Sequence, residues 1–480
     1  MKSPFFRTLV MAAFAALASI IAAYYYPWPE KVVVSAIVDT PLFESYDSSS
    51  VRSIRIVKFS AEKNGLDQIL LRRSGEKWIV PSKKNFIATN AAQIAAAANS
   101  LIDRTVLEET TDEQQAYLEY GVVDPIEYQS NPNRSALGTK IILEDRNRRE
   151  LASLIVGARP KSDRTGLKHY VRVPGQPSVY VIEFDRRALS TDFKSWVDPN
   201  LLQLSNQSPI NRIQIENYRI APESKDASKR QLNYRARFGV AQQKLGLMSV
   251  EAGGKEGNWT KVGITPEVNQ QLQVLGTQIG AIRFSDVIRK SKEVAKLLKS
   301  PNKDADQKPL DSLRQYGFFN VGFENASFDL DSEGGEISVQ TGDGVVVTLW
   351  IGSLAKSADS GNLLLSRHVM VLAGVDESIL PEPKKPAANS DAEAAEKSEK
   401  AYLRAVEARK TKLKSAYLRA SEFNQKNADW IYVVSDDVID KIRPEVNLPD
   451  TGMTGAKEDK AKSNSSDSVS DSATTSTEEN

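Results

Sequence analysis

The side chains that could do chemistry in this sequence are few. The chain has no cysteine, which excludes disulfides, thiolate metal sites, iron–sulfur clusters and cysteine nucleophiles. Its two histidines are His169 and His368, so a three-histidine zinc site is impossible. Both lie in strand-like runs at nearly equivalent places of an internal repeat. They could be paired ligands or acid–base groups, but strand residues half-covered by their neighbours explain them more simply.

Carboxylates offer a second possible chemistry. Asp185, Asp436 and Asp437 could supply the pair of carboxylates that glycoside hydrolysis requires. All three directly follow a predicted strand, at the start of a short helical stretch. Aspartate caps the free N–H groups at such a position. Capping is therefore the favoured interpretation.

Motifs with a known mechanism are absent. The sequence has no Gly-x-x-x-x-Gly-Lys-Ser/Thr loop, no His-Glu-x-x-His and no Gly-x-Ser-x-Gly elbow. Gly342-Asp343-Gly344 lacks the third glycine and the following helix of a dinucleotide site, and it predicts a hairpin turn. Trp78 and Trp259 could form a sugar platform, although equivalent tryptophans after turns favour core anchors. Trp196 is predicted to pack where two units join.

These observations predict no catalytic, cofactor-binding or metal-binding residue, and a protein that is not an enzyme. The charges are balanced, with 63 Lys plus Arg against 62 Asp plus Glu. A nucleic-acid-binding domain is normally basic, so no nucleic-acid partner is expected.

The elements that would position these residues occur twice. Ile54 and Ile56, in a predicted strand at 51–59, match Ile213 and Ile215 in a second strand at 210–218. The later matches keep their order in both copies. Trp78 matches Trp259, and a helix at 90–102, capped by Thr89 or Asn90, matches one beginning at 265–267. Tyr120-Gly121 matches Tyr316-Gly317. The strands at 139–143, 151–157, 169–173 and 179–182 match, in this order, those at 335–339, 346–352, 368–372 and 430–434.

Successive strands without intervening helices indicate an antiparallel meander. The fold class is therefore predicted as α+β, with two duplicated units of antiparallel sheet and packed helices. The predicted organisation is an anchor segment at 1–30, a linker at 31–50, a first unit at 51–204, a second unit at 205–445 and a disordered polar tail at 446–480.

The second unit carries an insertion at 381–423. Residues 391–423 are rich in Ala, Glu, Lys and Arg, which predicts a helix with coiled-coil character. The residues Leu403, Val406, Leu413, Tyr417 and Ala420 would share one face. This stripe could dock on the body or on a partner, and a solvated charged helix is an equal alternative.

The N-terminus predicts the compartment. Residues 9–26 carry no charge and would span about 27 Å as a helix, close to the hydrocarbon thickness of a bilayer. Lys2 and Arg7 precede the segment and an aromatic run ends it, which predicts an N-inside, single-pass anchor in the inner membrane and a periplasmic body. The alternative is a signal peptide cleaved after Ala18 or Ala23, which exports the same body.

Several of these residues resemble a known family. The order is an apolar N-terminal segment, Gly75-Glu76-Lys77-Trp78-Ile79-Val80-Pro81, a helix, Leu118 to Pro125, the glycine-terminated strand Leu154 to Gly157, Tyr170-Val171-Arg172, Val179-Tyr180-Val181, and Trp196-Val197-Asp198 before Leu201-Leu202. This order resembles the bacterial family called domain of unknown function 4340, over about residues 50–290. The resemblance implies a membrane-anchored periplasmic protein associated with ABC transport systems of the gliding-motility type. It implies no catalytic residue.

Together these features predict a non-catalytic accessory or scaffold component of an envelope ABC-type transport system, on the outer side of the inner membrane. Its partners would be the bilayer, through residues 9–26, and polytopic membrane proteins of the complex. The alternatives are an envelope glycan- or lipid-binding module and, less favoured, a carboxylate-dependent hydrolase.

Overall fold

A computed structural model describes residues 38–443. Within that range it leaves out residues 128–135, 203–208, 221–229, 242–243, 254–258, 262–265, 267–269, 271–273, 301–303, 305, 325–326, 356–364 and 387–391. The predicted anchor at 9–26 and the predicted tail at 446–480 lie outside the described residues. None of the helices that are described is both long and apolar enough to cross a bilayer.

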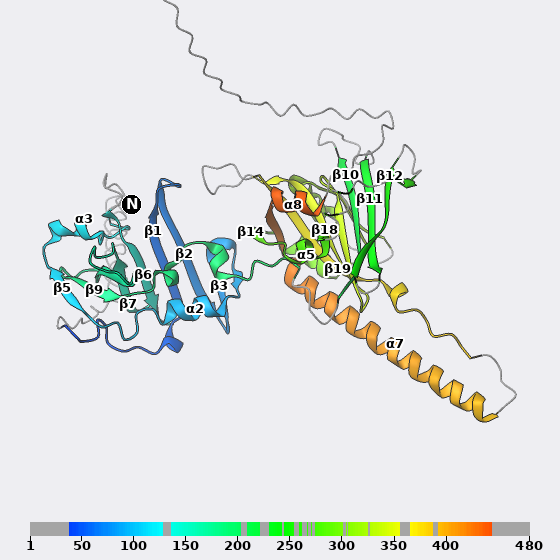
Figure 1. The fold of residues 1–480 in the computed structure, drawn as a ribbon, viewed down its shortest axis with the longest axis horizontal. Helices are drawn as coiled ribbons and strands as arrows, with labels where there is room; N and C mark the ends of the chain where they lie inside the picture. The colour runs from blue at the N-terminus through cyan, green and yellow to red at the C-terminus, as the bar shows by residue number, and fades with distance from the viewer. Residues whose placement is uncertain are drawn as a thin grey trace, which may run out of the picture.

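The first unit is a nine-stranded antiparallel sheet covered by short helices (Figure 1). Its strand order is β4-β3-β2-β1-β6-β7-β8-β9-β5. The strands are β1 (Ser53–Ser60), β2 (Gly65–Ser74), β3 (Lys77–Val80), β4 (Phe86–Ala88), β5 (Glu108–Thr111), β6 (Thr139–Glu144), β7 (Glu150–Val156), β8 (Lys168–Arg172) and β9 (Val179–Glu183). The helical segments are η1 (Ser48–Ser50), η2 (Pro81–Lys83), α2 (Ala91–Ala98), η3 (Gln114–Ala116), α3 (Tyr117–Tyr120), η5 (Arg186–Leu189) and η6 (Phe193–Trp196).

Alternation along the strands builds the core of this unit. Ile54 and Ile56 of β1 are fully buried and pair across the strands with Leu71 and Ile69 of β2, while Arg55 between them points the other way. Helix α2 closes this face with Ile94 and other buried residues. Asn90 caps the helix by accepting a hydrogen bond from the Gln93 N–H, which confirms one of the two predicted caps.

The second unit is another nine-stranded antiparallel sheet, with the order β13-β12-β11-β10-β17-β18-β19-β20-β14. Its strands are β10 (Ile210–Ile220), β11 (Arg230–Ala241), β12 (Lys244–Gly253), β13 (Trp259–Lys261), β14 (Phe284–Arg289), β17 (Glu336–Thr341), β18 (Val345–Ala355), β19 (Ser366–Val375) and β20 (Trp430–Ser435). A separate hairpin consists of β15 (Phe318–Glu324) and β16 (Ser327–Ser332). The helical segments are α5 (Leu275–Gly280), α6 (Lys292–Lys299), η8 (Lys308–Tyr316), η9 (Glu377–Ile379), α7 (Ala392–Asn427) and α8 (Asp436–Ile442).

The two sheets have the same strand order. In each, the first four strands form a meander, the next strand crosses to the far edge, and the last four strands fill the space between. The predicted α+β class with antiparallel sheets and packed helices is confirmed. The shared order also supports the predicted duplication, because two unrelated meanders would rarely repeat the same crossover.

The Tyr-Gly pairs occupy matching corners of the two units. Gly121 and Gly317 both end a helical segment in the left-handed conformation, with φ of 67° and 80°. In both corners the tyrosine carbonyl packs against a glycine of a later strand, just after the end of β7 in the first unit and within β18 in the second. A Cβ on Gly157 would collide with the Tyr120 oxygen, and one on Gly352 with the Tyr316 oxygen. Local sequence therefore builds the same corner twice.

The two units meet edge to edge. The β4 edge of the first sheet contacts the β14 edge of the second, where Phe86 packs against Phe284 and Trp430 with ring centroids 5.9 and 4.8 Å apart. Phe193 of η6 lies 5.6 Å from Phe86 and completes the cluster. The backbone N–H of Leu201 also donates to the Ile282 carbonyl. The apolar cores of both units thereby form one continuous cluster.

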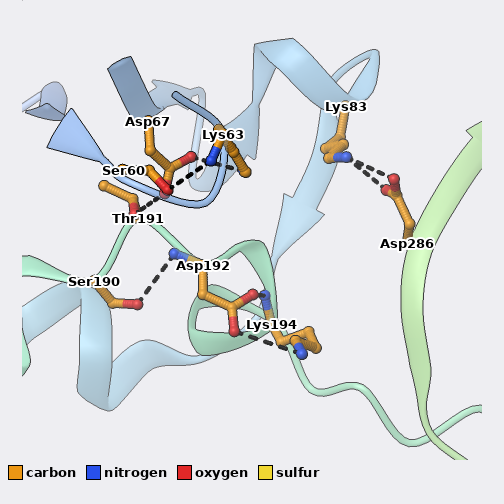
Figure 2. A network of polar contacts seen from close by, with 9 residues as sticks. All are labelled: Ser60, Lys63, Asp67, Lys83, Ser190, Thr191, Asp192, Lys194 and Asp286. Atoms are coloured by element: carbon orange, nitrogen blue, oxygen red, sulfur yellow. Dashed lines mark hydrogen bonds and ion pairs between the residues drawn. The ribbon is translucent and has the colours of Figure 1, made fainter. Parts of the chain in front are cut away.

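Figure 2 shows the polar side of this junction. Lys83 of η2 points across to Asp286 of β14, with its Nζ 2.7 Å from the carboxylate. Arg289 donates a hydrogen bond of 3.0 Å to the Lys84 carbonyl in the same region. Trp196 is fully buried beside the junction and donates through Nε1 to the Ser190 carbonyl, in agreement with its predicted packing role.

Part of the predicted linker packs on the first unit. The Leu42 N–H donates to the Arg104 carbonyl, and the Val106 N–H donates to the Thr40 carbonyl. Leu42 and Phe43 are buried in the core. The prediction of a linker over 31–50 therefore needs correction at its C-terminal end, because these two apolar side chains gain more by burial than by remaining in a tether.

Candidate functional site

Helix α7 is a long element of the second unit that has no counterpart among the described elements of the first. It lies between β19 and β20, where the first unit joins β8 to β9 directly. It has 36 residues, which corresponds to about 54 Å at 1.5 Å per residue. The observed helix extends four residues beyond the predicted end at 423, since Phe423 and Asn427 continue to contact the body.

The C-terminal part of α7 is fixed to the sheet. Ala416 and Ala420 are buried against β18 and β19, and Phe423 packs on the same core. The Asn424 amide binds the backbone of Ala373 in β19 twice. Its Oδ1 accepts from the Ala373 N–H at 2.7 Å, and its Nδ2 donates to the Ala373 carbonyl at 2.8 Å.

The chain that leads into α7 runs back along the helix and holds its middle. Arg409 donates from Nε to the Leu380 carbonyl at 2.7 Å. Tyr417 donates its hydroxyl hydrogen to Glu377 at 2.7 Å, which raises the pKa of Tyr417. Arg419 forms an ion pair with Asp343, in the turn between β17 and β18. The predicted hairpin turn at Gly342 to Gly344 is thus confirmed, and it contributes to anchoring the helix.

The N-terminal part of α7 extends away from the sheet (Figure 1). Its apolar side chains stay in solvent, with Leu403 56% and Val406 36% exposed. We refer to the described residues 393–408 as the projecting arm. The i,i+4 pair Glu396–Lys400, at 2.5 Å, adds about 0.2–0.5 kcal/mol to the helix of this arm.

The observed docking face differs from the predicted stripe. Leu413 is half-buried and Ala420 is buried, as predicted, but Leu403, Val406 and Tyr417 are exposed. The face that contacts the body instead follows Arg409, Leu413, Ala416, Ala420, Asn424 and Asn427. The apolar pattern missed it because small alanines and polar side chains that bind backbone carry this contact.

The two histidines lie one register position apart. His169 pairs across the strands with Ile182 and is buried, whereas His368 pairs with Val433 on β20. Tyr170, rather than His169, takes the place of His368: Tyr170 packs on Tyr120, and His368 packs on Tyr316. Burial lowers the pKa of both histidines. Although the two histidines align in the sequence repeat, they therefore do not come together to form one site.

The candidate carboxylates have structural partners. Asp185 caps η5 by accepting from the Arg187 N–H, and the hydrogen bonds with Arg187 lower the pKa of Asp185. Asp436 lies in the first turn of α8 and accepts from Arg367 Nε at 2.6 Å. The cap position of α8 belongs to Ser435, so the predicted capping role is seen at Asp185 and not at Asp436 or Asp437.

The remaining candidates add no ligand site. Trp78 is half-buried on β3 and packs against the core, while the side chain of Trp259 lies outside the described ones. In the part of the chain that the structure describes, no cluster of three or more His, Asp or Glu side chains could hold a metal ion.

Comparison with known proteins gives a family match over part of this architecture. Two antiparallel sheets with covering helices, joined in tandem, define an α+β protein. The family model described as a domain of unknown function, DUF4340, matches residues 78–301. Over these residues the chain matches the DUF4340 family model, which confirms the resemblance predicted from its motifs. The match begins in β3 and ends just after α6, so it spans the junction of the units. Neither a curated protein nor a solved structure gives a significant match.

Proposed function

We propose that this chain is a non-catalytic accessory or scaffold component of a bacterial envelope transport system of the ABC type. Residues 9–26 would anchor it in the inner membrane, with the body on the periplasmic side. The two joined units would hold α7 at a defined place, and the projecting arm would contact a polytopic membrane protein of the complex.

The observation that carries this proposal is the division of α7 into a fixed and a free part. Residues from Arg409 onward are held by hydrogen bonds and buried alanines, whereas Leu403 and Val406 project into solvent. Exposed leucine and valine on a rigid, oriented helix are typical of helix-in-groove recognition. A helix that only covered its own sheet would not need the additional turns that precede Arg409.

The charge pattern defines the partner surface. Around Leu403, the arm presents the basic residues Lys400 and Arg404 and the acidic residues Glu399 and Glu407. A partner of matching chemistry is an amphipathic groove with an apolar floor and both signs of charge at its rim. Such a surface fits a protein better than an anionic bilayer, which would favour an arm with basic residues only.

Co-purification tests this proposal. The full chain is tagged at its C-terminus, membranes are solubilised in mild detergent, and the retained proteins are identified by mass spectrometry. Recovery of an ABC permease and its ATPase in near-stoichiometric amounts is expected. The Leu403→Gln/Val406→Gln variant should lose most of this recovery, because it removes the apolar side chains that the partner would contact. Its melting temperature should stay unchanged, because both side chains are exposed.

A matched control uses exposed leucines of the first unit. Leu118 and Leu167 are each 46% exposed, so Leu118→Gln/Leu167→Gln removes comparable apolar surface outside the arm. This control should retain the partners. Recovery of the wild-type chain alone would contradict the proposal and would favour an envelope glycan- or lipid-binding module.

A further inference from the structure

A second feature lies near the C-terminal end of α7, which is the end of the helix opposite the projecting arm. Helix α6 begins at Ser291, whose side chain accepts from the Val294 N–H. Its buried residues Val294 and Leu298 pack into an apolar cluster with Leu310, Leu313 and Met370. This packing fixes the rotation of α6 and so determines where its polar face points.

The polar face of α6 carries three lysines. Lys292, Lys296 and Lys299 follow one another at steps of four and three, which places them on one side of the helix. Like charges at this spacing repel each other and destabilise an isolated helix by a few tenths of a kcal/mol. The helix therefore concentrates positive charge at a cost to its own stability.

All three lysines line a pocket of about 400 Å³. Arg289 and Lys290, at the end of β14, contribute a guanidinium and a further amine to its wall. Asp429 is the single acidic residue among the nine that line it. The chain as a whole has 63 basic and 62 acidic residues, so this excess of positive charge is local.

Asp429 neutralises only part of the pocket. Its carboxylate lies 2.5 Å from Lys299 Nζ and 3.9 Å from the Arg289 guanidinium. Lys292 and Lys296 form no ion pair with any residue that the structure describes. Gln425, near the end of α7, adds an amide that can donate a hydrogen bond.

Lys290 forms the buried part of the wall. It is 7% exposed, and its Nζ donates to the carbonyls of Ala428 and Trp430. These two carbonyls hold the buried amine in place. Burial lowers the pKa of Lys290 to about 7, although the neighbouring Asp429 raises it in part. An anion in the pocket would compensate the positive charge that burial disfavours.

We propose that this pocket binds a phosphate group, carried by a phosphorylated small molecule or by a lipid headgroup. A phosphate dianion can accept hydrogen bonds from several lysine ammoniums at once, and lysine acts toward it as a point charge. The paired Asp429 holds Lys299 and Arg289 in place, which leaves Lys292 and Lys296 for the ligand. A single carboxylate would balance less of this charge.

The first measurement is calorimetric titration of the full chain in neutral detergent. The probes are inorganic phosphate and short-chain phosphatidic acid below its micelle concentration, with sodium chloride and short-chain phosphatidylcholine as controls. Saturable binding of a phosphate-bearing probe is expected. Comparable affinity for both phosphate probes assigns the site to a free phosphate group, and a strong preference for phosphatidic acid assigns it to a lipid headgroup.

The Lys292→Gln/Lys296→Gln variant should bind the probe at least tenfold more weakly, because it removes two charge-assisted contacts. The control Lys410→Gln/Lys414→Gln makes the same charge change at the same helical spacing on exposed positions of α7. It should bind as the wild type does. Failure of every phosphate probe to bind, or equal weakening in both variants, would overturn the proposal. Since partner recovery depends on Leu403 and Val406, this outcome is separate from the test of the arm.

Discussion

Gly352 shows how one residue type can be required by its surroundings. A Cβ at this position would meet the Tyr316 carbonyl oxygen and would lie 3.0 Å from the Phe318 ring. The same corner in the first unit places Gly157 against Tyr120. These glycines are needed because backbone from two elements approaches closely, and not because of their own backbone angles.

The Gly352→Ala variant should therefore lose about 1–3 kcal/mol of unfolding free energy through overpacking. Urea denaturation measures this loss. Gly374→Ala is the matched control, since a Cβ there would meet nothing within 4 Å. Equal stability of the two variants would show that the corner relaxes without cost.

Lys290 gives the stability of the protein a pH dependence. Its pKa is lowered from the ordinary value of 10.5 to about 7 in the folded chain, mainly by burial. Between these values the unfolded chain binds more protons than the folded chain, so the contribution of Lys290 to stability rises with pH.

Relative to Lys290→Met, the wild type should gain roughly 2 kcal/mol of unfolding free energy between pH 7 and pH 9. Chemical denaturation of both proteins at several pH values measures this difference. Parallel stability curves would mean that the amine keeps its ordinary pKa.

At the scale of elements, the strands were easier to predict than the contacts of α7. Alternating apolar residues such as Ile54 and Ile56 predicted β1 and, through their repeat, β10. The alignment of His169 with His368 was wrong by one position, because short apolar strands match almost equally well in two registers. A shift of one residue moves the side chain to the other face of the sheet.

The composition of α7 predicted its helix, but not the part that docks. Asn424 carries the contact through two hydrogen bonds to Ala373, a signal that apolar periodicity does not contain. Lys290 was missed for a related reason: a single lysine after a strand gives no indication in sequence that its amine is buried.

The Asn424→Ala variant should lose about 1–3 kcal/mol of stability, because the Ala373 N–H and carbonyl lose their side-chain partners. Hydrogen exchange should also show faster opening at residues 413–427. The exposed neighbour Glu422 provides the control variant Glu422→Ala. If α7 remained as protected as in the wild type, the amide would not be its anchor.

At the scale of the whole molecule, the aromatic junction determines whether the two units act as one body. Phe284 contacts Phe86, Phe193 and Tyr432, with ring centroids between 5.0 and 6.5 Å. Lys83 and Asp286 add an ion pair whose side chains are 30% and 41% exposed. The apolar contacts should dominate, because partly exposed ion pairs contribute up to about 1 kcal/mol.

The Phe284→Ala variant is expected to lose about 3–5 kcal/mol. Calorimetry should then resolve two unfolding transitions where the wild type shows one. Lys83→Gln should keep a single transition. Two transitions already present in the wild type would mean that the units unfold independently despite the shared core.

We propose that α7 presents its projecting arm to a membrane-protein partner. Site-specific photo-crosslinking in cells tests it most directly, with the reactive residue placed at position 403 or, as a control, at position 422 on the docked part of the helix. A crosslink from position 403 to a permease of a transport complex is expected, and none from position 422. Crosslinks from neither position, or only from position 422, would contradict it.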